Sequence, residues 1–246
     1  MLDRLAFAVL VPALAWGQAE NPRWKPAVTL QTGLSSTFQM TLGGTFGEGP
    51  AWFHRATIDF PDVLRKGDGL VLQGWLTRDL PSTRQDWTLG LAYRPRVWAK
   101  GKHVVASSFG WQRWLFPSVL SGANDHLVAS NVTYRTKWKL PIQVSADNWV
   151  LVSSPLRRGN ATYIQAGTQH TLWKAGSKRV VLKHGPATTY SYHFYDRSGW
   201  RVLRYTGSLL FETRYWTVEG SLRQQDAIAA RVPNNRYWCF QLTRRM

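Results

Sequence analysis

The stretch Val128–Leu140, VASNVTYRTKWKL, decides how the rest of the chain is interpreted. Its side chains alternate between two kinds. One set is apolar, aromatic or uncharged: Val132, Tyr134, Thr136, Trp138 and Leu140. The other set carries three cations: Thr133, Arg135, Lys137 and Lys139. A repeat of two places these sets on opposite faces of a β-strand, whereas a helix would scatter them around its axis. The stretch therefore predicts a strand with one apolar face and one cationic face.

The same alternation recurs along the chain, between connectors rich in Gly, Asn, Asp, Ser and Pro. It predicts about twelve strands, at Val28–Phe46, Ala51–Phe60, Gly69–Arg78, Asp86–Val97, His103–Leu115, Leu127–Lys139, Ile142–Ser153, Ala161–Lys174, Arg179–Tyr195, Trp200–Thr206, Leu209–Leu222 and Arg236–Thr243. Most are near the length of about 9–11 residues that a tilted strand needs to cross a bilayer. We therefore expect an all-β protein, a single antiparallel up-and-down transmembrane β-barrel.

The connectors support an even number of strands with both chain ends on one side. Short turns are expected at Pro61–Asp68, Ala99–Lys102, Leu140–Pro141, Ala175–Lys178 and Gly207–Ser208. Longer loops are expected at the other end, among them Asp79–Gln85, Phe116–Asp125 and Arg223–Asn235. Short periplasmic turns and long outer loops are typical of bacterial barrels.

The first residues predict export. Arg4 precedes an apolar run from Leu5 to Trp16, and Gly17-Gln18-Ala19 ends it with small and polar residues. This is the pattern of a secretory signal peptide, residues 1–19, cleaved after Ala19; the alternative is an N-terminal core helix. The barrel domain would then span residues 20–246. No later apolar run approaches the roughly 20 residues that a membrane helix needs.

The net charge requires an anionic neighbour. The chain has 31 Lys and Arg against 14 Asp and Glu, a formal charge of +17. Basic and aromatic residues on a sheet could bind nucleic acid, but a secretory signal argues against that partner. We expect outer-membrane lipid and small anionic solutes as the partners. We also expect water or lipid head groups around two basic pairs, Arg157-Arg158 and Arg244-Arg245. The single cysteine, Cys239, excludes an internal disulfide framework and a cysteine-based zinc site.

The two faces of the strands predict what each one meets. Tryptophan favours the membrane interface, where its apolar ring and N–H donor are both accommodated, and seven lie at or near strand ends: Trp52, Trp87, Trp98, Trp138, Trp173, Trp200 and Trp238. The polar faces would line a lumen with the basic residues Arg55, Arg94, Arg96, Arg135, Lys137, Lys139 and Arg214 and the acidic residues Asp59, Asp86, Asp147 and Glu212. A secreted soluble β protein that binds acidic glycans is the alternative, with these tryptophans packed in a core.

The chain resembles a Gram-negative outer-membrane β-barrel in four features: the signal peptide, the alternating strands, the aromatic residues at strand ends and the last strand, Tyr237–Leu242 (YWCFQL). The resemblance covers nearly the whole mature chain. It implies location in the outer membrane and insertion by the barrel-assembly machinery. Such proteins often end on a Phe, whereas here the chain continues past Phe240 to Met246. By size, strand number and charge it also resembles small twelve-stranded channels for acidic oligosaccharides.

No motif predicts an enzyme, a metal site or a cofactor. The six histidines lack metal-ligand spacing, and the only grouping worth testing for lipid hydrolysis is Asn124-Asp125-His126 with Ser118 and Ser121. A ring of fixed cations would favour anions in a pore, so we expect a channel for small anionic solutes. The alternative is that the cations pair with the lumenal acids in a non-conducting structural barrel.

Overall fold

The computed structural model describes residues 25–37, 49–82, 84–116, 123–154, 157–194, 197–229 and 234–246, and the expected signal peptide lies outside these ranges. Their strands are β1 (Ala27–Ser35), β2 (Ala51–Pro61), β3 (Gly69–Asp79), β4 (Gln85–Arg94), β5 (Trp98–Lys100), β6 (His103–Phe116), β7 (Ala123–Thr136), β8 (Ile142–Ser154), β9 (Arg157–Ala175), β10 (Lys178–Phe194), β11 (Arg197–Glu212), β12 (Trp216–Ala227) and β13 (Asn235–Arg245). No helix in the described ranges is long and apolar enough to cross a membrane.

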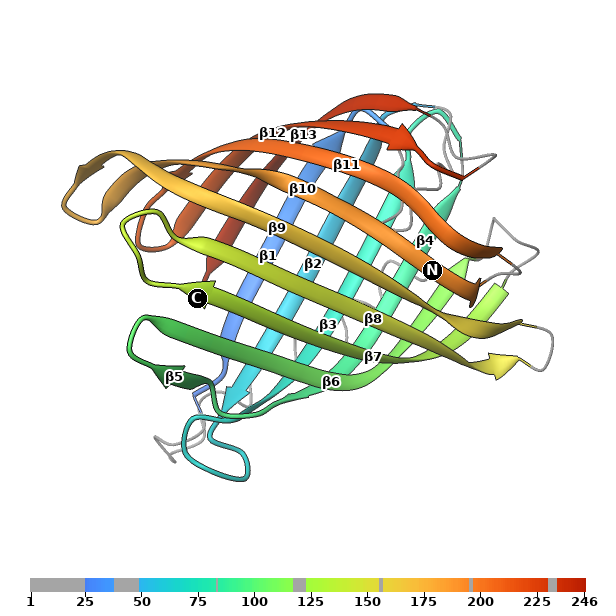
Figure 1. Cartoon of the computed structure of the whole chain (residues 1–246), viewed down its shortest axis with the longest axis horizontal. Helices are drawn as coiled ribbons and strands as arrows, with labels where there is room; N and C mark the ends of the chain where they lie inside the picture. Colours follow the sequence, from blue (N-terminus) through green and yellow to red (C-terminus); the bar gives the residue numbers. More distant parts are fainter. Residues whose placement is uncertain are drawn as a thin grey trace.

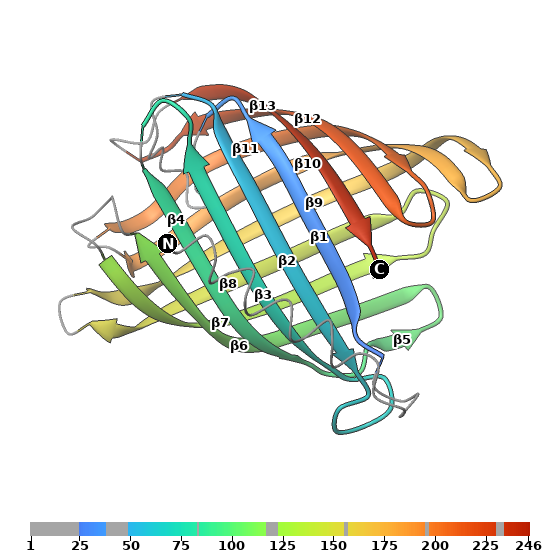
Figure 2. The same cartoon turned by 180° about the vertical axis from the view of Figure 1, so that it is seen from behind.

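Twelve of these strands form one closed antiparallel barrel, as Figures 1 and 2 show from its two sides. Each strand pairs with its neighbours in sequence, and β4 pairs with β6 because the three-residue β5 only extends the edge of β6. The ring closes where β1 pairs with β13, from Thr29 opposite Arg245 to Ser35 opposite Cys239. The predicted fold class, an up-and-down barrel of about twelve strands, is confirmed.

One predicted turn is wrong. Gly207 and Ser208 lie inside β11 and pair with β10 on one side and β12 on the other. The real turn is at residues 213–215, where the Thr213 amide donates to the Trp216 carbonyl at 2.7 Å. The alternation runs unbroken through Gly207 and Ser208, so the ladder hydrogen bonds outweigh the local turn preference of this pair.

The connections divide into two ends, which we name the turn end and the loop end. The turn end holds residues 62–68, 95–102, 137–141, 176–177 and 213–215, at the left of Figure 1. The hairpin between β9 and β10 is the tightest of them, since Ala175 pairs directly with Lys178 and Gly176 adopts a φ of +56°. Positive φ is nearly free for glycine, which is why this position terminates the strand so sharply.

The outer face of the barrel is apolar. Large exposed side chains such as Leu89, Val132, Leu209 and Phe240 point away from the lumen, while their neighbours in sequence point inward. Leucine and tryptophan side chains on the outer surface fit a hydrocarbon solvent, and closure leaves no unpaired strand edge for that solvent to contact. A soluble sandwich, in which these side chains would be buried between two layers, does not have this geometry.

The turn between β2 and β3 is held by two carboxylates: Asp62 accepts a hydrogen bond from the Gly67 amide, and Asp68 is the buried one. Asp68, which is 2% exposed, accepts hydrogen bonds from the Arg65 amide at 2.8 Å, from the Leu64 amide and from the Tyr93 hydroxyl at 2.9 Å. Desolvation acts to raise the pKa of Asp68, but the hydrogen bonds from Tyr93 and the backbone outweigh it and hold the pKa below its usual value.

The alternation within β7 can be tested at two adjacent positions. Val132→Arg places a charge on the outer face near mid-strand, which should reduce the free energy of unfolding by about 2–4 kcal/mol. Thr133→Arg places the same charge in the lumen and should cost much less. Urea titration of the barrel in lipid vesicles, scored by heat-modifiable gel migration, measures both. Equal losses for the two variants would contradict the assignment of the faces.

The Asp68 turn predicts a dependence on pH. Asp68→Asn removes the charged acceptor and should lower the midpoint of urea unfolding at neutral pH. Because the folded pKa is lowered, the stabilisation by Asp68 is present above the unfolded pKa of about 4 and is lost as the pH falls through the folded value. The difference between wild type and variant should therefore shrink below about pH 4. A difference that persists unchanged at lower pH would refute the role of the ionised carboxylate.

Candidate functional site

The lumen of the barrel is the candidate site. Seven of the predicted lumenal residues lie on barrel strands at inward-facing positions: Arg55, Arg94, Arg135, Asp59, Asp86, Asp147 and Glu212. The direction of each follows from the register, since direct cross-strand partners share a face. Arg55, for example, is the direct partner of Trp75 on β3, and its guanidinium reaches Gln73 on the same face of β3 in a 3.0 Å hydrogen bond.

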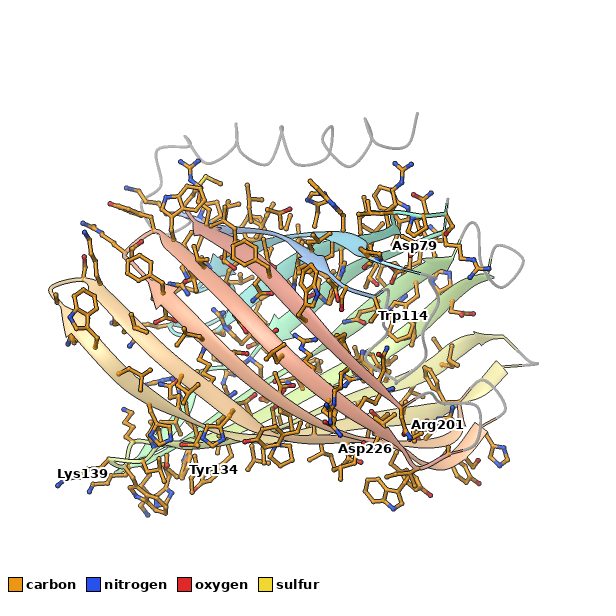
Figure 3. All side chains as sticks on the ribbon, turned by 90° about the horizontal axis from the view of Figure 1, so that it is seen from above. Asp79, Trp114, Tyr134, Lys139, Arg201 and Asp226 are labelled. Atoms are coloured by element: carbon orange, nitrogen blue, oxygen red, sulfur yellow. The ribbon has the colours of Figure 1, made fainter. Side chains whose placement is uncertain are left out.

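Four predicted lumenal cations lie elsewhere. β7 ends at Thr136, whose hydroxyl accepts a hydrogen bond from the Ile142 amide at 3.0 Å, so Lys137 and Lys139 belong to the turn. Arg96 follows the end of β4, and Arg214 lies in the turn before β12. The alternation of sequence continues past these strand ends, whereas the backbone pairing does not. Figure 3 shows Lys139 at the turn end of the barrel and Asp79 at the opposite end.

The predicted interface tryptophans lie near both ends of the barrel. Trp52, Trp87, Trp200 and Trp238 are near the strand ends at the loop end, and Trp98, Trp138 and Trp173 are at the turn end. Six of them are exposed and Trp87 is half-buried. Their assignment to the membrane interface remains a prediction.

One lumenal cluster is built around Arg55 on β2. Its guanidinium donates to Gln73 Oε1 at 3.0 Å and lies 5.7 Å from the centre of the Trp75 ring. It also interacts electrostatically with Asp147 on β8, although β3, β4, β6 and β7 lie between the two strands. Asp147 itself accepts a 2.7 Å hydrogen bond from Asn131. Charges on opposite walls of the barrel therefore influence each other across the lumen.

A second cluster lines the wall formed by β9, β11, β12 and β13. Arg204 donates to Gln225 Oε1 at 2.9 Å and hydrogen-bonds the Tyr163 side chain. Arg223 hydrogen-bonds its cross-strand partner Tyr237 and lies 5.7 Å from the centre of that ring. The Arg223 guanidinium places a positive charge on this wall, and Glu219 is an acid on the same face of β12.

The lumenal acids are arranged differently. Asp59 forms an ion pair with Arg94, and Glu212 forms one with Arg179. Both pairs lie towards the turn end. A third acid, Glu219, accepts a 2.6 Å hydrogen bond from Gln241, which in turn accepts one from Gln31 at 2.7 Å. This chain joins β12, β13 and β1 across the closure of the barrel.

An apolar cluster occupies the lumen near the loop end. Leu127, Leu151, Ala161 and Phe194 are buried against Trp114, and Trp149 packs beside them. The ring centres of Trp114 and Trp149 are 6.0 Å apart, and those of Trp114 and Phe194 are 6.3 Å apart. Figure 3 shows Trp114 between the two walls. The cluster places apolar side chains in the lumen along the walls of β6 to β10.

Several lumenal residues were missed by the sequence prediction, namely Lys183, Arg204, Glu219 and Arg223. Arg204 was hidden by the false turn at Gly207 and Ser208. Without that turn, the alternation through Val202, Arg204 and Leu210 would have placed it inside. Arg223 was missed because the predicted strand stopped one residue before it, whereas β12 continues to Ala227.

The grouping considered for hydrolysis is separated by the strand. Asp125 and His126 are adjacent in β7 and so point to opposite faces: Asp125 is buried inward, and the His126 ring lies 5.5 Å from that of Trp111 on the outer face. Ser118 and Ser121 lie outside the described residues. Within the described ranges, no group of three His, Cys, Asp or Glu side chains has the arrangement of a metal site.

Comparison with known proteins gives structural relatives only. No protein-family model matches the chain, and no curated protein matches it in sequence. The fold is similar to an outer membrane channel from Pseudomonas putida, with a TM-score of 0.58 and 12% identity over 90% of this chain and 95% of that one.

Two further similar structures have different activities. The KdgM porin, solved in complex with disordered oligogalacturonate, has a TM-score of 0.51 and 9% identity over 89% of this chain and 98% of that one. The outer membrane phospholipase A from Escherichia coli has the same score and identity over 92% and 94%. The resemblance predicted from the sequence is confirmed at the level of architecture: the chain has the fold of Gram-negative outer-membrane β-barrels.

Proposed function

We propose that this protein is an outer-membrane channel that passes small anionic solutes through a basic lumen. The closed barrel and its apolar outer face support the location, together with the predicted signal peptide, residues 1–19. The two channels among the similar structures support passage of solutes by this architecture.

The state of the lumenal cations carries the proposal. Arg223 is engaged by the phenol of Tyr237, and its Nε atom is buried without a hydrogen-bond partner among the described residues. Arg55 hydrogen-bonds a neutral amide, while Asp147 takes its hydrogen bond from Asn131. A carboxylate or phosphate on a passing solute would satisfy these donors, because charged acceptors form the stronger hydrogen bonds with guanidinium. Fixed cations of this kind lower the barrier for anions.

Two of the lumenal acids pair with other cations towards the turn end, Asp59 with Arg94 and Glu212 with Arg179. Asp147 attracts Arg55 electrostatically but takes its hydrogen bond from Asn131, and Glu219 takes its hydrogen bond from Gln241. The apolar cluster around Trp114 lines the lumen near the loop end. A solute that enters there would pass these apolar side chains before it meets the lumenal arginines. The alternative function, a non-conducting structural barrel, would require these elements to close the lumen.

Conductance in planar bilayers tests the proposal. The reversal potential of the wild-type barrel in a KCl gradient should show preference for chloride. A unit charge about 8 Å away in water stabilises an anion by about 0.5 kcal/mol and destabilises a cation by the same amount, so each lumenal arginine removed should reduce the anion-to-cation permeability ratio about fivefold. Arg55→Gln combined with Arg223→Gln should thus reduce it about 25-fold. Arg236→Gln, at an exposed position outside the lumen, is the matched control and should change it little.

Two results would count against the channel. A barrel that shows heat-modifiable migration but carries no current would support the structural role. A preference for potassium, or a permeability ratio unchanged in the double variant, would exclude the basic lumen as the source of selectivity.

A further inference from the structure

The two ends of the barrel differ in charge. The turn end carries a belt of exposed basic side chains: Arg65, Lys66, Arg96, Lys100, Lys102, Lys137, Lys139, Lys174, Lys178, Arg214, Arg244 and Arg245. The acids in the described turns of this end are Asp62 and Asp68, and Asp68 is occupied by its own turn. At the loop end, cations such as Arg78 lie beside acids such as Asp79 and Asp226. Among the described residues, the larger excess of cations is therefore at the turn end.

Within this belt lies a defined cavity. It has a volume of about 280 Å³ and is lined by Tyr215, Trp216, Arg244, Arg245 and Met246. The lining residues are two arginines, two aromatic residues and Met246, with no acidic side chain among them, and Arg244 is the arginine whose side chain is on the outer face. Such a surface favours an anion that carries an apolar body.

The arginines are held in place by local contacts. Arg244 is the direct cross-strand partner of Trp216, and its guanidinium carbon lies 5.1 Å from the centre of the indole ring. The backbone amide of Arg245 donates to the Tyr215 carbonyl at 2.8 Å, and its side chain reaches the Thr217 hydroxyl at 3.4 Å. Arg214 lies 5.1 Å from the ring centre of Tyr215 and adds a third cation beside the cavity. The site is therefore positioned before any ligand arrives.

The position of the cavity identifies the source of the anion. Trp216 and Arg244 face outward from the barrel, towards the membrane rather than the lumen. Trp98, Trp138 and Trp173 stand at the same end, as expected where strands leave the hydrocarbon and meet the head groups. A membrane lipid can fill this place with its phosphate at the arginines and its chains along the outer wall. A soluble polymer would meet the lumenal rim instead.

We propose that this cavity binds the phosphate-bearing head group of an anionic phospholipid in the leaflet at the turn end of the barrel. Arg244 supplies donors for the phosphate, Arg214 adds a further cation beside it, Trp216 and Tyr215 enclose the glycerol region, and the surrounding basic belt increases the local concentration of anionic lipid.

Native mass spectrometry of the folded full chain in detergent tests this site with defined lipids. Phosphatidylglycerol should bind the wild-type protein more tightly than phosphatidylcholine of the same chain length. Each basic side chain near a membrane surface contributes about fivefold in affinity for anionic lipid, so Arg244→Gln with Arg214→Gln should weaken phosphatidylglycerol binding by roughly 25-fold. Inorganic phosphate at millimolar concentration should not displace the lipid, because it lacks the acyl chains.

Matched controls separate the cavity from general charge and from misfolding. Arg78→Gln removes an outward-facing arginine opposite Trp52 at the loop end and should leave binding unchanged. Lys137→Gln with Lys139→Gln removes two charges from the belt but not from the cavity, and should weaken binding less. Heat-modifiable migration on a gel confirms that each variant is folded. If the double variant does not fold, Arg244→Gln alone replaces it in the test and should weaken phosphatidylglycerol binding about fivefold.

Three outcomes would overturn the proposal: equal binding of the two lipids, unchanged binding in the double variant, or displacement by phosphate alone. Equal losses in the belt variant and the cavity variant would also overturn it, since the belt as a whole would then hold the lipid.

Discussion

The pairing of β1 with β13 is the interaction on which the rest of the structure depends. A strand in hydrocarbon cannot leave its backbone N–H and C=O groups without partners, because each unsatisfied group costs several kcal/mol. The register from Thr29 to Ser35 against Cys239 to Arg245 removes the two free edges that an open sheet of this size would have. Closure then fixes an inside and an outside for every strand, so the alternation of side chains becomes a separation between lipid and lumen.

Much of this architecture could be predicted from the sequence, because the repeat of two is a local signal that survives without tertiary information. The stretch at Val132 and Thr133 shows both faces in adjacent residues. Fold class, strand number and several turns followed from that repeat. What failed was local: Gly207 and Ser208 have the composition of a turn, but two neighbouring strands supply the hydrogen bonds that keep them extended.

The contents of the lumen were less accessible to prediction. Sequence can assign Arg55 and Asp147 to inward faces, but only the closed ring shows that they influence each other across it. The apolar cluster around Trp114 had no signal at all, since a tryptophan on a strand resembles an interface residue until its direction is known. The location of four basic residues in turns was also not predictable from the sequence: Arg96, Lys137, Lys139 and Arg214. Their positions depend on where each strand ends, and strand ends are set by pairing and turn geometry rather than by side-chain type.

The seam between β1 and β13 also has a consequence for how the molecule forms. Gln31 and Gln241 meet there although 210 positions separate them along the polypeptide. Contacts of such separation are entropically expensive to nucleate and form late, so every intermediate before them is an open, curled sheet with two reactive borders. Synthesis of the last strand is thus a precondition for the ring, and the seam is the natural place for it to part again under stress.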